Sequence, residues 1–316
     1  MIKSIREGGK KMQEFYELKK EFVEYLQFSG KVKKTIKRHE VNLRDFFKFL
    51  EERKIKDIYE IKYNDLIEYQ KYRKSIRGSH GKENSADHNN RFTATVKKFF
   101  EFLKRQGYLV YDPASDIEYS KVPQRLPKTA LSYKDFKKIV KQIDINSLTG
   151  YRDRTILEVL FSSALRRQEL INIKLKDIDY ENGFVRVIGK GDKERMVPVG
   201  KIACQYVENY IVGVRPFFKK SKNNDKLFLS IQGCGISETA LWTLINKYVT
   251  LAKLSQNISA HSFRRGAATG MIRNNAHIML VRDMLGHNGM EAIKSYVDLT
   301  IVDLKKAHKK THPREK

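Results

Sequence analysis

Hydrophobic residues recur at helical spacing through the first hundred residues. The first stripe comprises Phe15, Leu18, Phe22, Tyr25 and Leu26, and Gly30 ends its helix. A second helix carries Val32, Ile36, Leu43, Phe46, Phe47 and Leu50. A third is expected over about 63–74. A fourth carries Val96, Phe99, Phe100 and Leu103 and stops near Gly107. The polar run 77–90 between them predicts a loop. These patterns predict a helical domain over 13–111.

The periodicity breaks between residues 112 and 128. Pro113, Pro123 and Pro127 fall in this run, and proline resists helix interiors because it lacks an amide donor. We expect a linker here, extended and basic through Lys121, Arg125 and Lys128. Two domains joined in this way can wrap a rod-shaped ligand.

The second domain, expected over 129–316, is mostly helical as well. Ser132 is a candidate cap for a helix through Val140, and a further helix covers about 155–162. Residues 184–188 and 196–199 predict two strands joined by the turn 189–192. Helices follow near 201–212, 237–253, 261–274, 278–285, 290–297 and 301–309. The predicted fold is therefore mainly α with a small β-hairpin in the second domain.

Positively charged residues greatly outnumber negatively charged ones in this chain. Lys and Arg number 63 against 37 Asp and Glu, a net charge of +26. Such an excess attracts polyanions, and nucleic acid is the leading partner. A lysine-rich proteome from an AT-rich genome is the plainer alternative. The candidate DNA-binding cations are Lys33, Lys37, Arg44 and Lys48 on the second helix, with Arg91, Lys97 and Lys98 on the fourth.

The cysteine content and the hydropathy of the chain indicate its cellular compartment. Only Cys204 and Cys234 occur, without metal-like spacing, so a disulfide framework is not expected. No apolar run approaches the length of about 20 residues that a membrane helix needs. We therefore expect a cytoplasmic protein without a membrane partner.

Candidate chemistry lies near the C-terminus. His261 and Arg264 form an H-x-x-R pattern, and Tyr296 stands nine residues after His287. Cleaving a phosphodiester by nucleophilic attack needs cations on the non-bridging oxygens, a nucleophile and a general acid. Arginine suits the first role because its planar fork grips two oxygens. The pattern indicates phosphoryl transfer. No metal or nucleotide cofactor is required if the bond energy is kept in a phosphotyrosine link.

Two upstream residues extend this set. Arg166 falls where a helix breaks, and Lys190 lies between two glycines at the hairpin tip. Taken singly, each candidate has a simpler explanation. A turn lysine is usually just exposed, and a histidine at a helix end usually caps it. Tyr296, one of 16 tyrosines, would more often belong to the core, and Arg166 would be a structural salt-bridge partner of Glu169. The order and spacing of the whole set carry the argument.

The motifs resemble those of the tyrosine recombinases. Residues 163–170, with the sequence SALRRQEL, resemble the family's first arginine motif. Residues 187–195, with the sequence VIGKGDKER, resemble its β-hairpin, closest to the XerC/XerD branch. His261 and Arg264 match the H-x-x-R box, and His287 with Tyr296 matches the end of the catalytic domain. The N-terminal helices resemble the family's SAM-like core-binding domain.

This resemblance implies a role for each residue. Tyr296 would be the nucleophile that forms a 3′-phosphotyrosyl bond, and Arg166 and Arg264 would clamp the scissile phosphate, helped by His287. His261 would assist proton removal, Lys190 would protonate the 5′-oxygen, and Glu169 would orient an arginine. Lys193 is a rival for the Lys190 role.

The resemblance also implies partners. The family clamps double-stranded DNA between its two domains like a C, at core sites with inverted repeats. It works as a tetramer that exchanges strands through a four-way junction. Each C-terminal helix, here about 300–310, is buried in a neighbour, which would explain the apolar Ile301 and Leu304. A paralogue or accessory protein is a further possible partner.

Two departures from the family pattern stand out. Ala164 replaces a usual glycine, which should be tolerated unless the position needs a positive φ. Gly270 falls within a predicted helix and should cost about 1 kcal/mol of local stability.

Three functions remain open on the sequence. The first is Xer-like resolution of chromosome or plasmid dimers, and the second is an integrase or resolvase of a mobile element with the same chemistry. Helices beginning by about residue 13 leave no room for an arm-binding domain, which favours the first. A non-catalytic DNA-binding protein is the third, and the six filled catalytic positions argue against it.

Overall fold

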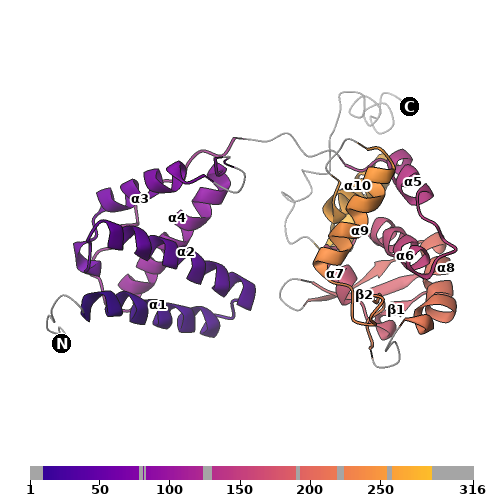
Figure 1. Ribbon diagram of the computed structural model, residues 1–316, viewed down its shortest axis with the longest axis horizontal. Helices are drawn as coiled ribbons and strands as arrows, with labels where there is room; N and C mark the ends of the chain where they lie inside the picture. Colours follow the sequence, from indigo (N-terminus) through magenta and orange to yellow (C-terminus); the bar gives the residue numbers. More distant parts are fainter. Residues whose placement is uncertain are drawn as a thin grey trace, which may run out of the picture. The chain divides into compact units, whose positions relative to one another are not determined.

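The chain forms two compact units, Met1–Gln124 and Arg125–Lys316 (Figure 1). The computed structural model describes residues 10–77, 81, 83–123, 130–189, 193–218, 224–254 and 258–286. Within these residues the fold is mainly helical with one small antiparallel sheet, which confirms the predicted fold class. No described helix combines the length and the apolar character needed to cross a membrane.

The first unit is helical. Its elements are α1 (Lys10–Phe28), α2 (Lys33–Glu52), the short 3-10 helix η1 (Ile58–Glu60), α3 (Tyr63–Ser75) and α4 (Ala86–Arg105). Helix α2 packs against both α1 and α4, and α3 packs against α4. The core is dominated by aromatic rings, among them Phe22, Phe46, Phe47, Phe99 and Phe100. The predicted hydrophobic stripes of the helices therefore meet in one core. Val32 is the exception, because it precedes α2 as its N-cap and is exposed.

The loop predicted over 77–90 is wrong for its last five residues. Helix α4 begins at Ala86, where the Ser85 hydroxyl accepts a hydrogen bond from the His88 amide at 3.2 Å. The first turns of α4 are polar and form hydrogen bonds with distant parts of the chain, so a search for a stripe of apolar residues does not detect them. The Asn90 side chain exchanges two hydrogen bonds with the Ser120 backbone, at 2.8 and 2.9 Å.

Part of the segment expected as linker packs on the first unit. Ala114 and Ile117 are buried in its core. The Lys97 ammonium group donates to the carbonyl oxygens of Ser115 and Ile117, at 2.9 and 2.7 Å. The chain therefore stays attached to α4 well beyond residue 112.

The second unit begins with two helices and a short third, α5 (Tyr133–Lys141), α6 (Leu148–Ser163) and α7 (Arg167–Asn172). The 3-10 turn η3 (Leu175–Asp177) leads into strands β1 (Ile178–Asp179), β2 (Phe184–Ile188) and β3 (Glu194–Pro198). The sheet order is β1-β2-β3 and both pairings are antiparallel. The hairpin was predicted, whereas β1 is a two-residue strand too short to show alternation.

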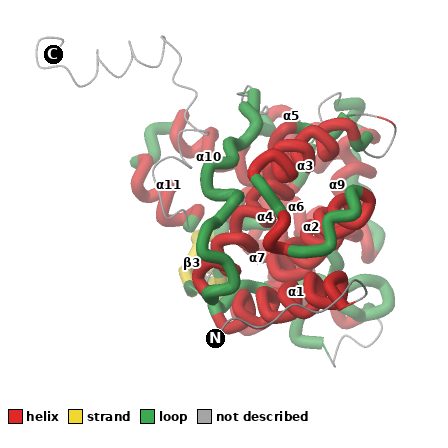
Figure 2. Tube along the Cα trace, turned by 90° about the vertical axis from the view of Figure 1, so that its left-hand side faces the viewer, coloured by secondary structure: helices red, strands yellow, loops and turns green. Residues whose placement is uncertain are grey.

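The remaining elements of the second unit are all helical. They are α8 (Lys201–Asn209), a π turn (Tyr210–Val214), a 3-10 turn (Arg215–Phe217), α9 (Glu238–Leu251), α10 (Ala260–Arg273) and α11 (Ile278–Leu285). Helix α6 packs against both α8 and α10. Helix α11 contacts both α10 and β3 (Figure 2). The helices expected near 290–297 and 301–309 lie outside the described residues.

Candidate active site

A left-handed residue between α6 and α7 positions Arg166. Ala164 caps the end of α6 with φ 49° and ψ 32°, so this position does use the conformation that favours glycine. Leu165 is then fully buried, and Arg166 forms the N-cap of α7. The break in the helix that was visible in the sequence thus turns Arg166 out of α6, with about a third of its side chain exposed.

Glu169 lies beneath Arg166 as a buried anionic centre. Its carboxylate accepts hydrogen bonds from the backbone and the side chain of Arg166, both at 2.8 Å. It also accepts two from the guanidinium group of Arg195, at 2.8 and 2.9 Å. Nη1 of Arg264 lies 3.9 Å from the same carboxylate. Three cations therefore surround one carboxylate that is 3% exposed.

The ionised form of Glu169 is favoured. Burial raises the pKa of its carboxyl, but the hydrogen bonds from Arg195 and Arg166 outweigh burial and hold the pKa below its ordinary value. The carboxylate is therefore charged at neutral pH and can fix the surrounding guanidinium groups.

Arg264 comes from the first half of α10. Its side chain is 1% exposed. One terminal nitrogen donates to the Ala164 carbonyl at 2.8 Å and the other to the Leu285 carbonyl at 2.6 Å. The strained turn at Ala164 therefore supplies a carbonyl that holds Arg264.

Three arginines meet the carboxyl end of α11. Arg195 donates to the Met284 carbonyl at 3.0 Å, Arg264 to that of Leu285, and Arg166 to that of Gly286 at 2.8 Å. A helix leaves its last carbonyls without intrahelical partners and carries partial negative charge there. The three arginines thus bind three consecutive carbonyl oxygens, and His287 follows directly in the sequence.

The remaining predicted catalytic residues are placed only in part. His261 is exposed in the first turn of α10, three residues before Arg264. Lys193 is exposed at the loop end of the hairpin, where its carbonyl accepts a hydrogen bond from the Gly189 amide at 2.8 Å. Five other predicted residues lie outside the described residues, namely Lys190, His287, Tyr296, Ile301 and Leu304.

Arg195 was missed by sequence reasoning. It lies at the end of the quoted hairpin motif, but the contacts that matter reach 26 residues back to Glu169 and 89 residues forward to Met284. No local spacing indicates such pairs. The available signal was the position of this arginine at the end of the hairpin motif, just before the strand predicted over 196–199. In the structure Arg195 belongs to β3 and lies opposite Val187.

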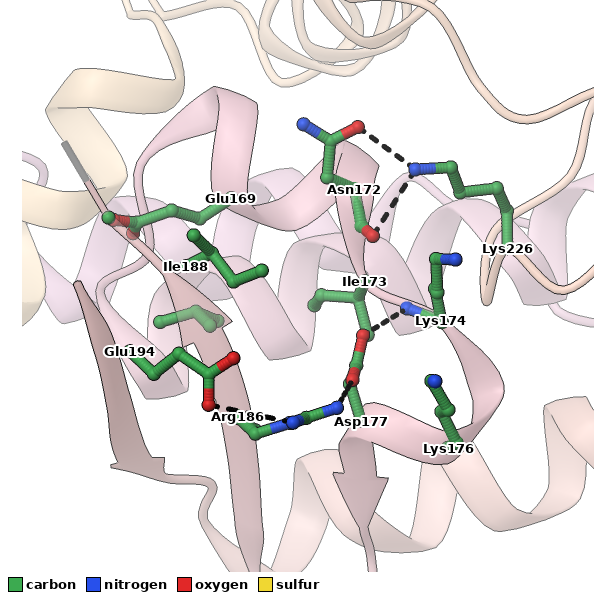
Figure 3. Close-up of a pocket in the computed structure, with 12 residues that line it drawn as sticks. Glu169, Asn172, Ile173, Lys174, Lys176, Asp177, Arg186, Ile188, Glu194 and Lys226 are labelled. Atoms are coloured by element: carbon green, nitrogen blue, oxygen red, sulfur yellow. Dashed lines mark hydrogen bonds and ion pairs between the residues drawn. The ribbon is translucent and has the colours of Figure 1, made fainter. Parts of the chain in front are cut away.

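A pocket of about 600 Å³ lies between β2 and the chain from α7 to η3, and Glu169 is one of the residues that line it (Figure 3). Arg186 bridges Asp177 and Glu194 across it, at 2.8 and 3.5 Å. Lys226 donates to the side chain of Asn172 at 3.0 Å. Most of the charged side chains that line this pocket are therefore already paired with one another or with neighbouring residues.

The predicted DNA-binding cations divide into two groups. Lys33, Lys37, Arg44 and Lys48 are all exposed on α2. On α4, Arg91 pairs with Asp87 at 2.6 Å and Lys97 is engaged by the segment after residue 112. Lys98 is half-buried beside them. Lys97 therefore has a structural role that the sequence did not show.

The charge of the first unit also acts on a buried histidine. Burial lowers the pKa of His39 to about 4, with smaller contributions from Arg38, Lys98 and Lys31. The neutral ring lies 3.0 Å from the Thr95 hydroxyl, between α2 and α4. His39 therefore joins the two helices without adding to their positive charge. Among the described residues, no group of three His, Cys, Asp or Glu side chains is arranged to hold a metal ion.

The chain belongs to the phage integrase family of tyrosine recombinases. The family's model matches residues 129–301, and its N-terminal SAM-like domain matches residues 20–107. A relative named tyrosine recombinase XerD, from Staphylococcus saprophyticus, is 32% identical over 295 residues, which cover 92% of this chain and 98% of the relative. XerD of Staphylococcus aureus strain Mu50 is 31% identical over the same shares.

Solved structures show the same fold. The XerH site-specific recombinase in a post-cleavage complex with its difH substrate has a TM-score of 0.71 at 19% identity, covering 87% of this chain and 79% of that one. A lambda integrase dimer bound to a core site has a TM-score of 0.68 at 14% identity, covering 90% and 77%. At these identities the likeness concerns architecture alone.

Proposed function

We propose that the chain is a site-specific DNA recombinase that cuts and rejoins strands through a 3′-phosphotyrosyl intermediate. The observation that carries the proposal is the meeting of Arg166 and Arg264 at Glu169 and at the carboxyl end of α11. These arginines are far apart in the sequence, and His287 and Tyr296 follow α11 at the family's spacing. Preorganised cations of this kind stabilise the charge that builds on a phosphate in the transition state.

The roles are those that the resemblance to the family implies, and the chemistry of each group suits them. Arg166 and Arg264, with His287, would bind the non-bridging oxygens, and Tyr296 would attack the phosphorus with help from His261. The leaving 5′-oxygen needs a proton, for which Lys190 is the first candidate and Lys193 the second. Conserving the bond energy in the phosphotyrosine link lets the strand be rejoined without a nucleotide cofactor.

DNA is the proposed partner. One face of α2 carries four exposed cations, Lys33, Lys37, Arg44 and Lys48. Neutralisation of backbone phosphates by such cations supplies most of the non-specific affinity of a protein for DNA. We further propose a double-stranded core site with inverted repeats. The protein would act on it as a tetramer joined through the C-terminal helix, and we expect it at the nucleoid in the cytoplasm.

Resolution of chromosome or plasmid dimers is the proposed biological role. Its support is the match to XerD relatives over 98% of their length. A plasmid with two directly repeated target sites should be resolved into two circles in cells that express the protein. Insertion of a circle into a single chromosomal site, without resolution, would instead favour the integrase of a mobile element.

The chemical proposal is tested with Tyr296→Phe. Duplexes that the protein selects from host DNA are synthesised with a nick beside the crossover point, so that a cleaved strand cannot be religated. The wild type should form a protein–DNA band resistant to SDS, because the phosphotyrosyl bond is covalent. Tyr296→Phe should bind the same duplex and form no such band. An equal band from both proteins would refute Tyr296 as the nucleophile.

A further inference from the structure

Arg195 connects three elements of the second unit. It stands on β3, its two terminal nitrogens bond the two oxygens of Glu169 on α7, and its Nε bonds the Met284 carbonyl at the end of α11. Every nitrogen of the guanidinium group is therefore engaged, and the side chain is 15% exposed. A planar fork satisfies such a set of acceptors, whereas the single ammonium group of lysine cannot.

The neighbouring backbone is fitted to this guanidinium group. Gly286 ends α11 with φ 62°, and a Cβ added there would lie 3.0–3.1 Å from Nε, Cζ and Nη1 of Arg195. The end of α11 and Arg195 thus pack more closely than a side chain at residue 286 would allow. The contact holds the carbonyls that also bind Arg166 and Arg264.

We propose that Arg195 is a positioning residue for the strand-cleavage reaction, which fixes Glu169 and the end of α11 and thereby the two phosphate-binding arginines. This inference rests on the proposed function. It also links the hairpin to the site, because β3 begins directly after the loop that carries Lys190 and Lys193. A shift of β3 against α11 would move Glu169 and, with it, Arg166.

A pH profile separates positioning from a merely structural role. The charged groups that face Glu169 are Arg166 from α7, Arg195 from β3 and Arg264 from α10. Removing Arg195 removes two hydrogen bonds that lower the pKa of the carboxyl, while burial continues to raise it. Glu169 would then be protonated at a higher pH, and the cleavage rate would begin to fall at a higher pH than in the wild type.

The test compares Arg195→Lys and Arg195→Gln with the wild type on the nicked duplex used above. We expect single-turnover adduct formation to slow by about 10–100-fold, as for groups that orient a reacting centre through another residue, with duplex affinity within about twofold. The acid side of the rate profile should move to higher pH, further in Arg195→Gln than in Arg195→Lys, because only lysine keeps the charge. Thermal unfolding identifies any variant that has lost its fold. In that case the adduct rate and the pH profile of the other variant decide the test.

Arg186→Lys is the matched control. Arg186 stands on the neighbouring strand β2 and pairs with Asp177 and Glu194, so its adduct rate and pH profile should match the wild type. Wild-type rate and profile in both Arg195 variants, or equal slowing in Arg186→Lys, would overturn the positioning role. No adduct from the wild type itself would instead overturn the proposed function, and the positioning role with it.

Discussion

Glu169 is a buried negative charge shared by three arginines. Burying a carboxylate is costly unless cations and hydrogen bonds compensate it, and here Arg166, Arg195 and Arg264 do so. The same carboxylate holds these cations at fixed positions around it. A single residue therefore serves both the stability of the second unit and the geometry of the candidate site.

Glu169→Gln should lower the free energy of unfolding of the second unit by about 3 kcal/mol at pH 7, because it leaves buried cations without their counter-charge. The folded pKa of Glu169 lies below its ordinary value of 4.5. The contribution of the ionised carboxylate to the free energy of unfolding is therefore fully present above pH 4.5. It is lost as the pH falls through the folded pKa. Urea unfolding of both proteins at pH 7 and about pH 3 should show a difference that shrinks in acid.

The control for this prediction is Glu238→Gln. Glu238 pairs with Arg167 of the same helix α7 at 2.6 Å, but both side chains are partly exposed. Exposed pairs contribute little, so this variant should unfold within about 0.5 kcal/mol of the wild type. An equal loss in both variants would mean that burial of Glu169 is not the cause.

At the level of elements, α10 shows how two glycines in one helix can differ. A Cβ on Gly266 would collide with the Leu131 carbonyl, where the chain enters the second unit. A Cβ on Gly270 would meet nothing within 4 Å. The first glycine is needed for close packing of α10, whereas the second only weakens the helix.

The pair gives opposite predictions for one helix. Gly270→Ala should raise the free energy of unfolding by up to about 1 kcal/mol through helix propensity. Gly266→Ala should lower it by about 1–3 kcal/mol through overpacking. Chemical denaturation followed by circular dichroism measures both, and destabilisation by Gly270→Ala would contradict the open space beside it.

Most helices could be predicted because their apolar residues repeat on one face, as in α2 and α4. The start of α4 could not, since its first turns are polar and have partners thirty positions away or at the cap. Within the site, Arg166, Glu169 and Arg264 were found from motifs. Arg195 and the end of α11 were not, because their contacts join segments that only the tertiary fold brings together.

At the level of the whole molecule, the net charge of +26 favours a polyanionic partner for both units. DNA affinity should fall steeply with salt, with a slope of about 0.9 per phosphate contacted. Substituting Lys37 and Arg44 by Ala should each reduce that slope by up to about 1. Lys71→Ala on α3, where Lys71 pairs with Glu68, should leave it unchanged. A flat salt response of the wild type, measured by fluorescence anisotropy, would contradict the role of α2.

The most direct measurement is the identity of the residue that becomes joined to DNA. The wild-type protein is trapped on the nicked duplex, digested with a protease and a nuclease, and examined by mass spectrometry. The predicted result is one peptide that carries a nucleotide on Tyr296, attached through the 3′-phosphate. A nucleotide on another residue, attachment through a 5′-phosphate, or a wild type that binds the duplex without any adduct would contradict the account.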